Sequence, residues 1–292
     1  MKLGIAGMLP RAAADITAEN LQAVRDMGFT GACPSLGRAP DDVSAGERGR
    51  VRALFADCGL DLPQMWGPAT SLIHEDPAAQ ARDLSAIEAG IRLAADLGCP
   101  SLVLASGSYN PAGRFFADRR NFTPEALDRV AASLRKLVPI AADHCVSIGI
   151  EPGTATVVNT PRRMRTLLDM VDSPHVKVNL DPVNWINFYE YFDSGPFLDS
   201  MFDLLAENVS AIHAKDCAYE NKLCIHISEA PPGQGGLDYH TFLRRAADLP
   251  LDTYFIIEHT PDEHIPAARD HVLKVAKECG INFAARTPIL GR

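Results

Sequence analysis

Short apolar runs alternate with longer amphipathic stretches along the whole chain. Eight of the runs resemble buried strands, and each is followed by a stretch with the periodicity of a helix. The predicted strands are residues 3–7, 31–35, 62–66, 101–105, 146–150, 176–180, 209–212 and 253–257. The predicted helices are residues 17–27, 45–58, 77–97, 124–144, 195–206, 239–247 and 266–279, and one more that begins at Thr160-Pro161.

Signals at the helix ends support this division. Thr123 and Thr160 each precede a proline, as expected for an N-cap followed by proline at the first helical position. Gly28, Gly59 and Gly98 each follow a predicted helix, where glycine readily adopts the conformation that ends a helix. The polar stretch 217–238, between the seventh strand and its helix, is predicted to be a long loop.

The order of the elements predicts the fold. Strands that alternate with helices indicate a parallel sheet covered by helices, and eight such units indicate a closed (β/α)8 TIM barrel. An open doubly wound sheet is the alternative. A dinucleotide-binding Rossmann fold is disfavoured because the turn after the first strand contains no GxGxxG sequence. We therefore predict an α/β protein with one barrel domain, residues 1–282, and a C-terminal tail, residues 283–292.

Composition narrows the functional classes. The 292 residues are 47% hydrophobic and 22% charged, which is ordinary for a soluble enzyme with a large core. A formal net charge of −9 disfavours a nucleic-acid backbone or an anionic membrane as the main partner. No apolar run approaches the ~20 residues of a membrane span. The seven cysteines are scattered without a CxxC pair, which disfavours a disulfide framework and predicts a cytoplasmic location.

Four predicted strands end in side chains that can bind a metal. The carboxyl ends of barrel strands meet at one face, where the active sites of TIM barrels lie. Each residue taken alone is more typical of a helix cap, a salt bridge or a half-buried histidine, but four at equivalent positions are difficult to explain in that way. The four residues are Glu151, Asp181, His213 and Glu258.

The predicted ligand set has a clear chemical preference. Three carboxylates and one imidazole form a hard, mostly oxygen site, which suits Mn²⁺, Mg²⁺ or Co²⁺ and, less specifically, Zn²⁺. Three carboxylates within a few ångströms of one another would repel strongly without a cation. The pattern therefore predicts one divalent metal ion as cofactor.

The motifs around these residues resemble a known superfamily. They are Ile150-Glu151-Pro152, Leu180-Asp181-Pro182, Ile212–Asp216, Gly233–Tyr239 and Ile257-Glu258. Together they are similar to the xylose isomerase-like TIM barrels, in the branch of the sugar phosphate isomerases and epimerases. The resemblance covers nearly the whole chain, although its motifs lie in the second half.

The resemblance implies a function. It implies a metal-dependent isomerase or epimerase that acts on a sugar or keto-sugar through a metal-stabilised enediolate. It also implies that Glu151, Asp181, His213 and Glu258 are the ligands. In the ketose 3-epimerase branch the two glutamates also act as the acid/base pair, which here assigns the catalytic roles to Glu151 and Glu258.

Two departures from the 3-epimerase pattern affect the expected substrate contacts. The histidine that often follows the aspartate by three residues is Asn184 here, and the usual arginine after His213 is missing. Lys215 is the natural replacement as an electrostatic contact. Further predicted substrate-binding residues are Trp66 and Trp185, whose rings could cover a sugar, and His226 in the long loop. The expected partner is a sugar or cyclitol, and a homodimer or homotetramer is possible.

Three other functions are alternatives to this hypothesis. A lyase could use the same site, as an inosose-type or 3-dehydroshikimate-type dehydratase or in the cleavage of a 3-oxo-glycoside. A DNA repair enzyme similar to endonuclease IV is disfavoured, because its additional histidine ligands for three zinc ions are absent. A sugar-binding protein without catalysis is disfavoured by the complete ligand set.

Overall fold

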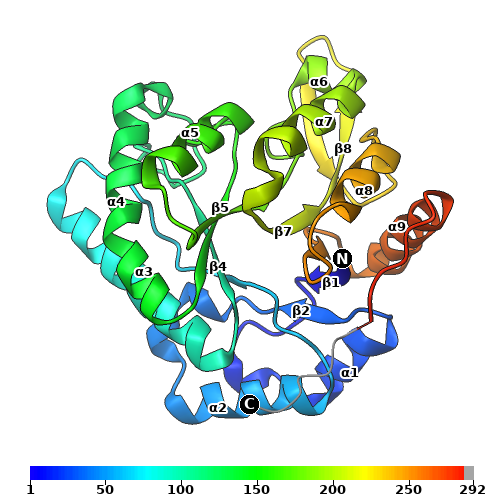
Figure 1. Ribbon diagram of the computed structural model, residues 1–292, viewed down its shortest axis with the longest axis horizontal. Helices are drawn as coiled ribbons and strands as arrows, with labels where there is room; N and C mark the ends of the chain where they lie inside the picture. Colours follow the sequence, from blue (N-terminus) through cyan, green and yellow to red (C-terminus); the bar gives the residue numbers. More distant parts are fainter. Residues whose placement is uncertain (286–292) are drawn as a thin grey trace.

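Eight parallel strands form the centre of the protein in a computed structural model, which describes the structure of residues 1–285. They pair in the order β2-β1-β10-β7-β6-β5-β4-β3, and the sheet curves into a nearly closed barrel (Figure 1). The predicted TIM-barrel fold is therefore confirmed. The strands are β1 (Lys2–Ala6), β2 (Gly31–Cys33), β3 (Met65–Trp66), β4 (Ser101–Ala105), β5 (Ser147–Glu151), β6 (Val176–Leu180), β7 (Val209–Ala214) and β10 (Tyr254–Ile257).

The barrel closes weakly between β2 and β3. A single isolated bridge joins Gly31 to Asp61, supported by the bond from the amide of Ala32 to the Asp61 carbonyl, 3.1 Å. The predicted strand 62–66 is reduced to Met65–Trp66. Pro63 explains the difference, because proline has no amide hydrogen to continue a ladder.

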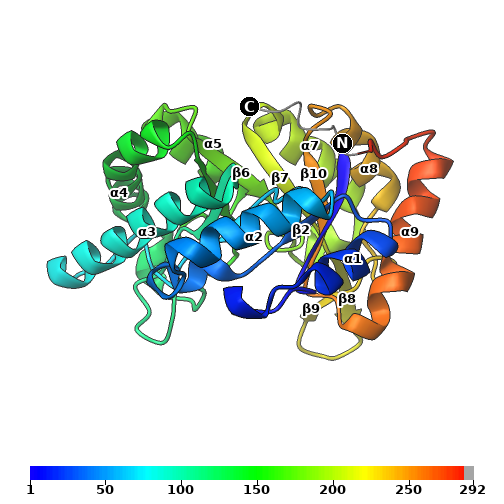
Figure 2. The same cartoon turned by 90° about the horizontal axis from the view of Figure 1, so that it is seen from below.

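Helices follow the strands and cover the outside of the barrel (Figures 1 and 2). The predicted caps are present: Thr123 and Thr160 accept hydrogen bonds from Ala126 and Arg163, and Gly98 is left-handed with φ of 74°. The helices are α1 (Ala18–Asp26), α2 (Ala45–Asp57), α3 (Pro77–Leu97), α4 (Pro124–Asp143), α5 (Pro161–Val171), α6 (Phe188–Phe192), α7 (Ser194–Leu205), α8 (Tyr239–Ala247) and α9 (Ile265–Glu278).

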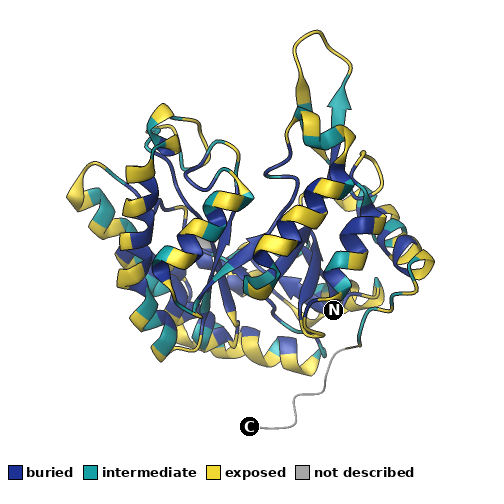
Figure 3. Ribbon diagram, turned by 45° about the horizontal axis from the view of Figure 1, so that its top comes forward, coloured by how far each residue is buried: buried dark blue, intermediate teal, exposed yellow. Residues whose placement is uncertain are grey.

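The predicted loop 217–238 is wrong over residues 217–230. There β8 (Asp216–Glu220) and β9 (His226–Ala230) form an antiparallel hairpin. It lies at the end of the barrel opposite the N terminus (Figure 2) and carries largely half-buried and exposed residues (Figure 3). The sequence does not predict the hairpin because its residues lack the strongly apolar faces of the barrel strands.

The division into a barrel and a tail stays a prediction. Residues 286–292 lie outside the described part of the chain, whereas Phe283 packs against Phe255 with ring centroids 6.2 Å apart. Within the described residues, no helix is long and apolar enough to cross a membrane. All seven cysteines lie in the described residues and carry free thiols.

Candidate metal centre and active site

Four metal-capable side chains converge at the carboxyl ends of neighbouring strands. Glu151 ends β5, Asp181 follows β6, His213 lies in β7 and Glu258 follows β10, and these strands are consecutive in the sheet. One potential ligand atom from each residue lies within 4.8 Å of the others, and all four residues are buried. The structure thus brings together the four residues predicted as metal ligands, here called the ligand cluster.

The imidazole of His213 faces the carboxylates of the cluster. Its Nδ1 lies 2.9 Å from Oε1 of Glu258 and 3.1 Å from Oε1 of Glu151. Burial opposes protonation of this ring, but the carboxylates, foremost Glu258, outweigh burial and hold the His213 pKa well above its usual value. The cluster therefore favours positive charge at its centre.

The two glutamates differ in their electrostatic surroundings. Burial raises the pKa of Glu151, because the charged form loses its hydration and lies close to the charge of Glu258. Burial acts in the same direction on Glu258, but the positive charges of His213 and Lys215 outweigh it and hold the Glu258 pKa well below its usual value. The surroundings thus shift the two pKa values in opposite directions.

Lys215 contributes a further positive charge. Its side chain is only 2% exposed, and Nζ lies 2.7 Å from Oε1 of Glu258 and 2.8 Å from Oδ2 of Asp181. Longer contacts reach Asn184 at 3.3 Å and Glu229 at 3.4 Å. Burial opposes the ammonium, but these carboxylates raise the Lys215 pKa well above its usual value.

The cluster fits a divalent cation. Both carboxylate oxygens of Glu258 and Oδ2 of Asp181 accept no well-directed hydrogen bond, although Lys215 lies close to two of them. Buried carboxylate oxygens in proteins normally have partners, so these three require an explanation. A cation coordinated by the cluster would satisfy them, and the donor set suits Mg²⁺, Mn²⁺ or Co²⁺.

Two amide side chains support the histidine from behind. Nitrogen atoms of Gln64 and Asn179 lie 2.5 and 2.9 Å from Nε2 of His213, while their oxygens have no partner. A half-turn of either amide would place a carbonyl oxygen against a ring N–H. Such a contact orients Nδ1 toward the carboxylates. Neither residue is among the predicted site residues; the only local signal for each is a polar side chain within an apolar run.

A cavity of about 420 Å³ adjoins the cluster. Glu151, Asn184 and Lys215 form its inner wall, while residues 227–229 of the hairpin and Phe115 contribute the outer wall. A larger cavity of about 510 Å³ lies at the amino ends of the strands, where Lys2 and Tyr254 are among its walls. Its described walls include no member of the cluster, so the smaller cavity is the candidate substrate site.

The sequence profile of a family described as "Xylose isomerase-like TIM barrel" matches residues 21–279, almost the whole barrel. The chain belongs to this family. The matched span includes all four residues of the ligand cluster. No curated protein is significantly similar to the chain in sequence.

Solved structures with the same fold include several sugar epimerases. The 3-keto-D-glucoside 4-epimerase from E. coli is 21% identical, with a TM-score of 0.70 over 95% of this chain and 99% of that one. A D-psicose 3-epimerase from Clostridium cellulolyticum, solved with D-tagatose, is 16% identical, with a TM-score of 0.71 over 94% and 99%. A xylose isomerase-like barrel from Mycobacterium smegmatis, in complex with magnesium, is 17% identical, with a TM-score of 0.70 over 95% and 97%. At these identities the likeness shows the fold alone.

Two predicted substrate contacts of this family member lie beside the cluster. Asn184 donates from its backbone to Oδ1 of Asp181 at 3.2 Å and from Nδ2 to Oε1 of Glu151 at 3.3 Å. Trp66 is half-buried, with its ring centroid 5.4 Å from that of His213. Both therefore contact residues of the cluster; Asn184 is also among the described walls of the cavity, whereas Trp66 is not.

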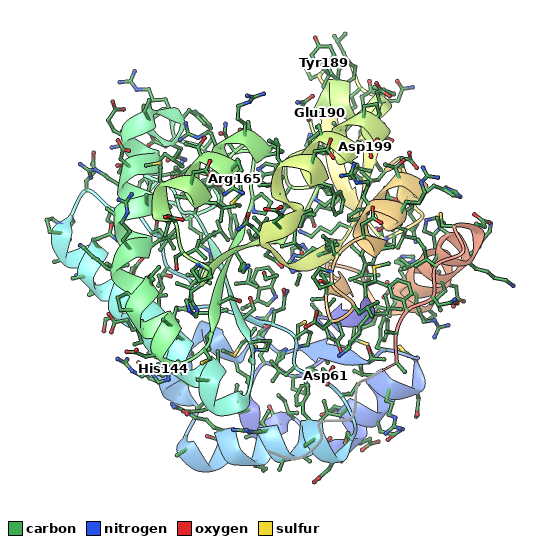
Figure 4. All side chains as sticks on the ribbon, in the orientation of Figure 1. Asp61, His144, Arg165, Tyr189, Glu190 and Asp199 are labelled. Carbon is green, nitrogen blue, oxygen red and sulfur yellow. The ribbon has the colours of Figure 1, made fainter. Side chains whose placement is uncertain are left out.

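Two other predicted substrate contacts, Trp185 and His226, lie away from the cluster. Trp185 is 3% exposed, and its indole donates to the carbonyl of Val158 at 3.1 Å, because the turn after β6 directs the ring into the core. The His226 side chain is 62% exposed on β9, 3.6 Å from Glu220, and is not among the walls of the cavity. The nearby helix α6 lies at the periphery, where Tyr189 projects outward (Figure 4).

Proposed function

We propose that the protein is a divalent-metal-dependent isomerase or epimerase of a sugar or keto-sugar. The observation that carries the proposal is the buried cluster of three carboxylates and one imidazole, with incompletely bonded oxygens, beside a cavity of about 420 Å³. The epimerases of keto-sugars among the structures with this fold support the same reaction class.

The reaction requires movement of a proton at a carbon next to a carbonyl. A bound divalent cation, held by Glu151, Asp181, His213 and Glu258, would acidify that carbon and stabilise the enediolate. Glu151 and Glu258 come from β5 and β10, which are separated in the sheet by β6 and β7. We assign one glutamate as the base that removes the proton and the other as the acid that returns one.

The remaining residues position the substrate. The ammonium of Lys215 and the amide of Asn184 line the cavity and can bind substrate oxygens. The face of Trp66 can cover the apolar side of a sugar. The cation is proposed to be Mn²⁺, Mg²⁺ or Co²⁺, the location cytoplasmic, and the assembly a homodimer or homotetramer.

Solvent exchange tests the proposal. Metal-loaded protein is incubated in D₂O with a panel of keto-sugars and cyclitols, and the substrates are followed by NMR. Deuterium uptake at one carbon without loss of water is the expected result. Loss of water would indicate the lyase instead, and binding without exchange would contradict both.

A further inference from the structure

The hairpin brings a carboxylate into the wall of the substrate cavity. Glu229 lies on β9, and its side chain is 47% exposed. One oxygen, Oε2, lies 2.9 Å from Nδ1 of His259, and the other, Oε1, lies 3.4 Å from Nζ of Lys215. Glu229 thus connects an element outside the barrel to two residues at the barrel rim.

The backbone of His259 is held in an uncommon conformation. Its φ is +50°, in the left-handed region, and it directly follows the cluster residue Glu258. This conformation is unfavourable for a residue with a β-carbon, so other contacts must maintain it. The hydrogen bond between Nδ1 of His259 and Glu229 is one of these contacts. It leaves the other ring nitrogen, Nε2, as the atom through which His259 can contact a ligand.

The pair of side chains matches neighbouring hydroxyl groups. A carboxylate accepts hydrogen bonds through two oxygens with about four lone-pair sites, so Glu229 keeps capacity beyond its present contacts. The Nε2 atom of His259 can accept from a hydroxyl when the ring is neutral and can donate to one when it is protonated. Because a hydroxyl both donates and accepts, a vicinal diol suits the pair in either state.

The charge of the cavity opposes anionic groups. Among the described residues in its walls, Glu151 and Glu229 are acidic, and Lys215 is the only lysine or arginine. Its ammonium is already held by Asp181 and Glu258. The remaining basic residue of these walls, His259, is paired with the carboxylate of Glu229. A phosphate monoester carries a charge of about −1.5 to −2 at neutral pH and would be placed against carboxylates, without a cation that is free of a carboxylate partner.

We propose that Glu229 and His259 form a hairpin subsite that binds two neighbouring hydroxyl groups of a neutral polyol and rejects substrates phosphorylated at that end. The inference rests on the proposed function for the position of the substrate. It assigns a role to the hairpin, which supplies substrate specificity from outside the barrel.

Equilibrium binding tests the subsite without requiring turnover. Mg²⁺-loaded wild type, Glu229→Gln and His259→Asn are titrated by saturation-transfer NMR with D-fructose and D-fructose 6-phosphate, and with myo-inositol and its monophosphate. Glu220→Gln is the matched control, because Glu220 lies on the same hairpin but is not among the described walls of the cavity. Retained Mg²⁺ binding verifies that each variant is folded.

We expect wild type to bind at least one neutral probe about tenfold or more tightly than its phosphate ester. Glu229→Gln should weaken neutral binding about tenfold and reduce this discrimination, because a hydrogen bond to a charged acceptor is lost. His259→Asn should weaken it less, and Glu220→Gln should change neither value. Equal affinities in wild type and Glu229→Gln, equal binding of the esters by wild type, or no neutral binding would overturn the subsite.

The same samples, placed in D₂O, separate this inference from the proposed function. Neutral binding that depends on Glu229, together with an absence of exchange, would overturn the proposed reaction and leave the subsite standing. If exchange proceeds, and Glu229→Gln has the affinity and discrimination of wild type, the subsite would be overturned and the proposed reaction would stand.

Discussion

The buried carboxylate of Asp216 lies near the end of β7, as does the ligand cluster. The two differ in how far their carboxylate oxygens are hydrogen-bonded. Asp216 is 1% exposed, and its carboxylate accepts four backbone hydrogen bonds of 2.8–3.0 Å, from Cys217, Gly233, Gly235 and Leu237. Glu258 is 2% exposed, but neither of its oxygens accepts a well-directed hydrogen bond. The two carboxylates are therefore almost equally buried, but only the oxygens of Asp216 accept well-directed hydrogen bonds.

The glycine-rich run explains how Asp216 is satisfied. A β-carbon at Gly235 would lie 2.3 Å from Oδ1 of Asp216 and 2.2 Å from the carbonyl of Cys217. Only glycine allows the chain to pass so close, and Gly233 also has a positive φ of 85°. The carboxylate of Asp216 thus holds the chain that follows the hairpin in place. The oxygens of the ligand cluster, in contrast, are left for a bound cation. This difference predicts that mutations in the two groups have separable effects.

Replacement of Glu258 by glutamine should cause the largest loss. It removes one ligand and one of the two proposed proton-transfer groups while it preserves the size of the side chain. We expect solvent exchange at the substrate carbon to fall by about 10³-fold, within the range for loss of general acid/base catalysis. NMR in D₂O measures the rate, and Glu263→Gln, an exposed acid in the next turn, is the control. Undiminished exchange would remove Glu258 from the mechanism.

Replacement of Asp216 by alanine should act on the fold. Four backbone N–H groups, those of the buried Cys217 and Leu237 and of the exposed Gly233 and Gly235, would lose a charged acceptor. We expect the free energy of unfolding to fall by about 3 kcal/mol. Urea titration measures the change, and Asp143→Ala, at the exposed end of α4, should alter stability by less than about 0.5 kcal/mol. Mg²⁺ affinity should persist in Asp216→Ala. Loss of Mg²⁺ affinity with an unchanged free energy of unfolding would mean that Asp216 serves metal binding and not the fold.

Replacement of Lys215 by methionine should strengthen metal binding by the cluster. The ammonium lies within 2.8 Å of two ligand carboxylates and repels a divalent cation at the same place. We expect calorimetric titration to give Mn²⁺ affinity about tenfold higher in the variant, which corresponds to ~1.4 kcal/mol. Weaker binding would mean that Lys215 orders the cluster instead of competing with the metal.

Replacement of Trp185 by phenylalanine should have the smallest effect. Like the carboxylate of Asp216, the indole N–H of Trp185 is buried and hydrogen-bonded to the backbone. Its acceptor is the carbonyl of Val158. Its loss should cost about 1 kcal/mol of stability, measured by urea unfolding. Affinity for a neutral sugar should remain that of wild type. A large rise in the sugar Kd would instead place Trp185 in the substrate site.

The sequence predicted those features that depend on local pattern and barrel geometry. Glu151, Asp181, His213 and Glu258 could be found because parallel barrel strands deliver their last residues to one face. Helices such as Pro77–Leu97 could be bounded by capping residues and glycine. Both kinds of prediction use periodicity and end signals that are local to the chain.

Features set by packing between distant segments could not be predicted. The place of Glu229 depends on how the hairpin folds over the rim, and the burial of Trp185 depends on one turn after β6. Gln64 supports His213 across 149 residues of sequence, a relation without a local signal. Pro63 did give a local warning that the third strand would be short.

Metal binding by EDTA-treated protein tests the central claim most directly. Calorimetric titration of wild type with Mn²⁺ should show one ion bound per chain, while Asp181→Asn, which keeps the side-chain shape but removes a ligand charge, should show no comparable binding. Failure of wild type to bind, or equal affinity and stoichiometry in both proteins, would contradict the assignment of the ligand cluster as a metal centre.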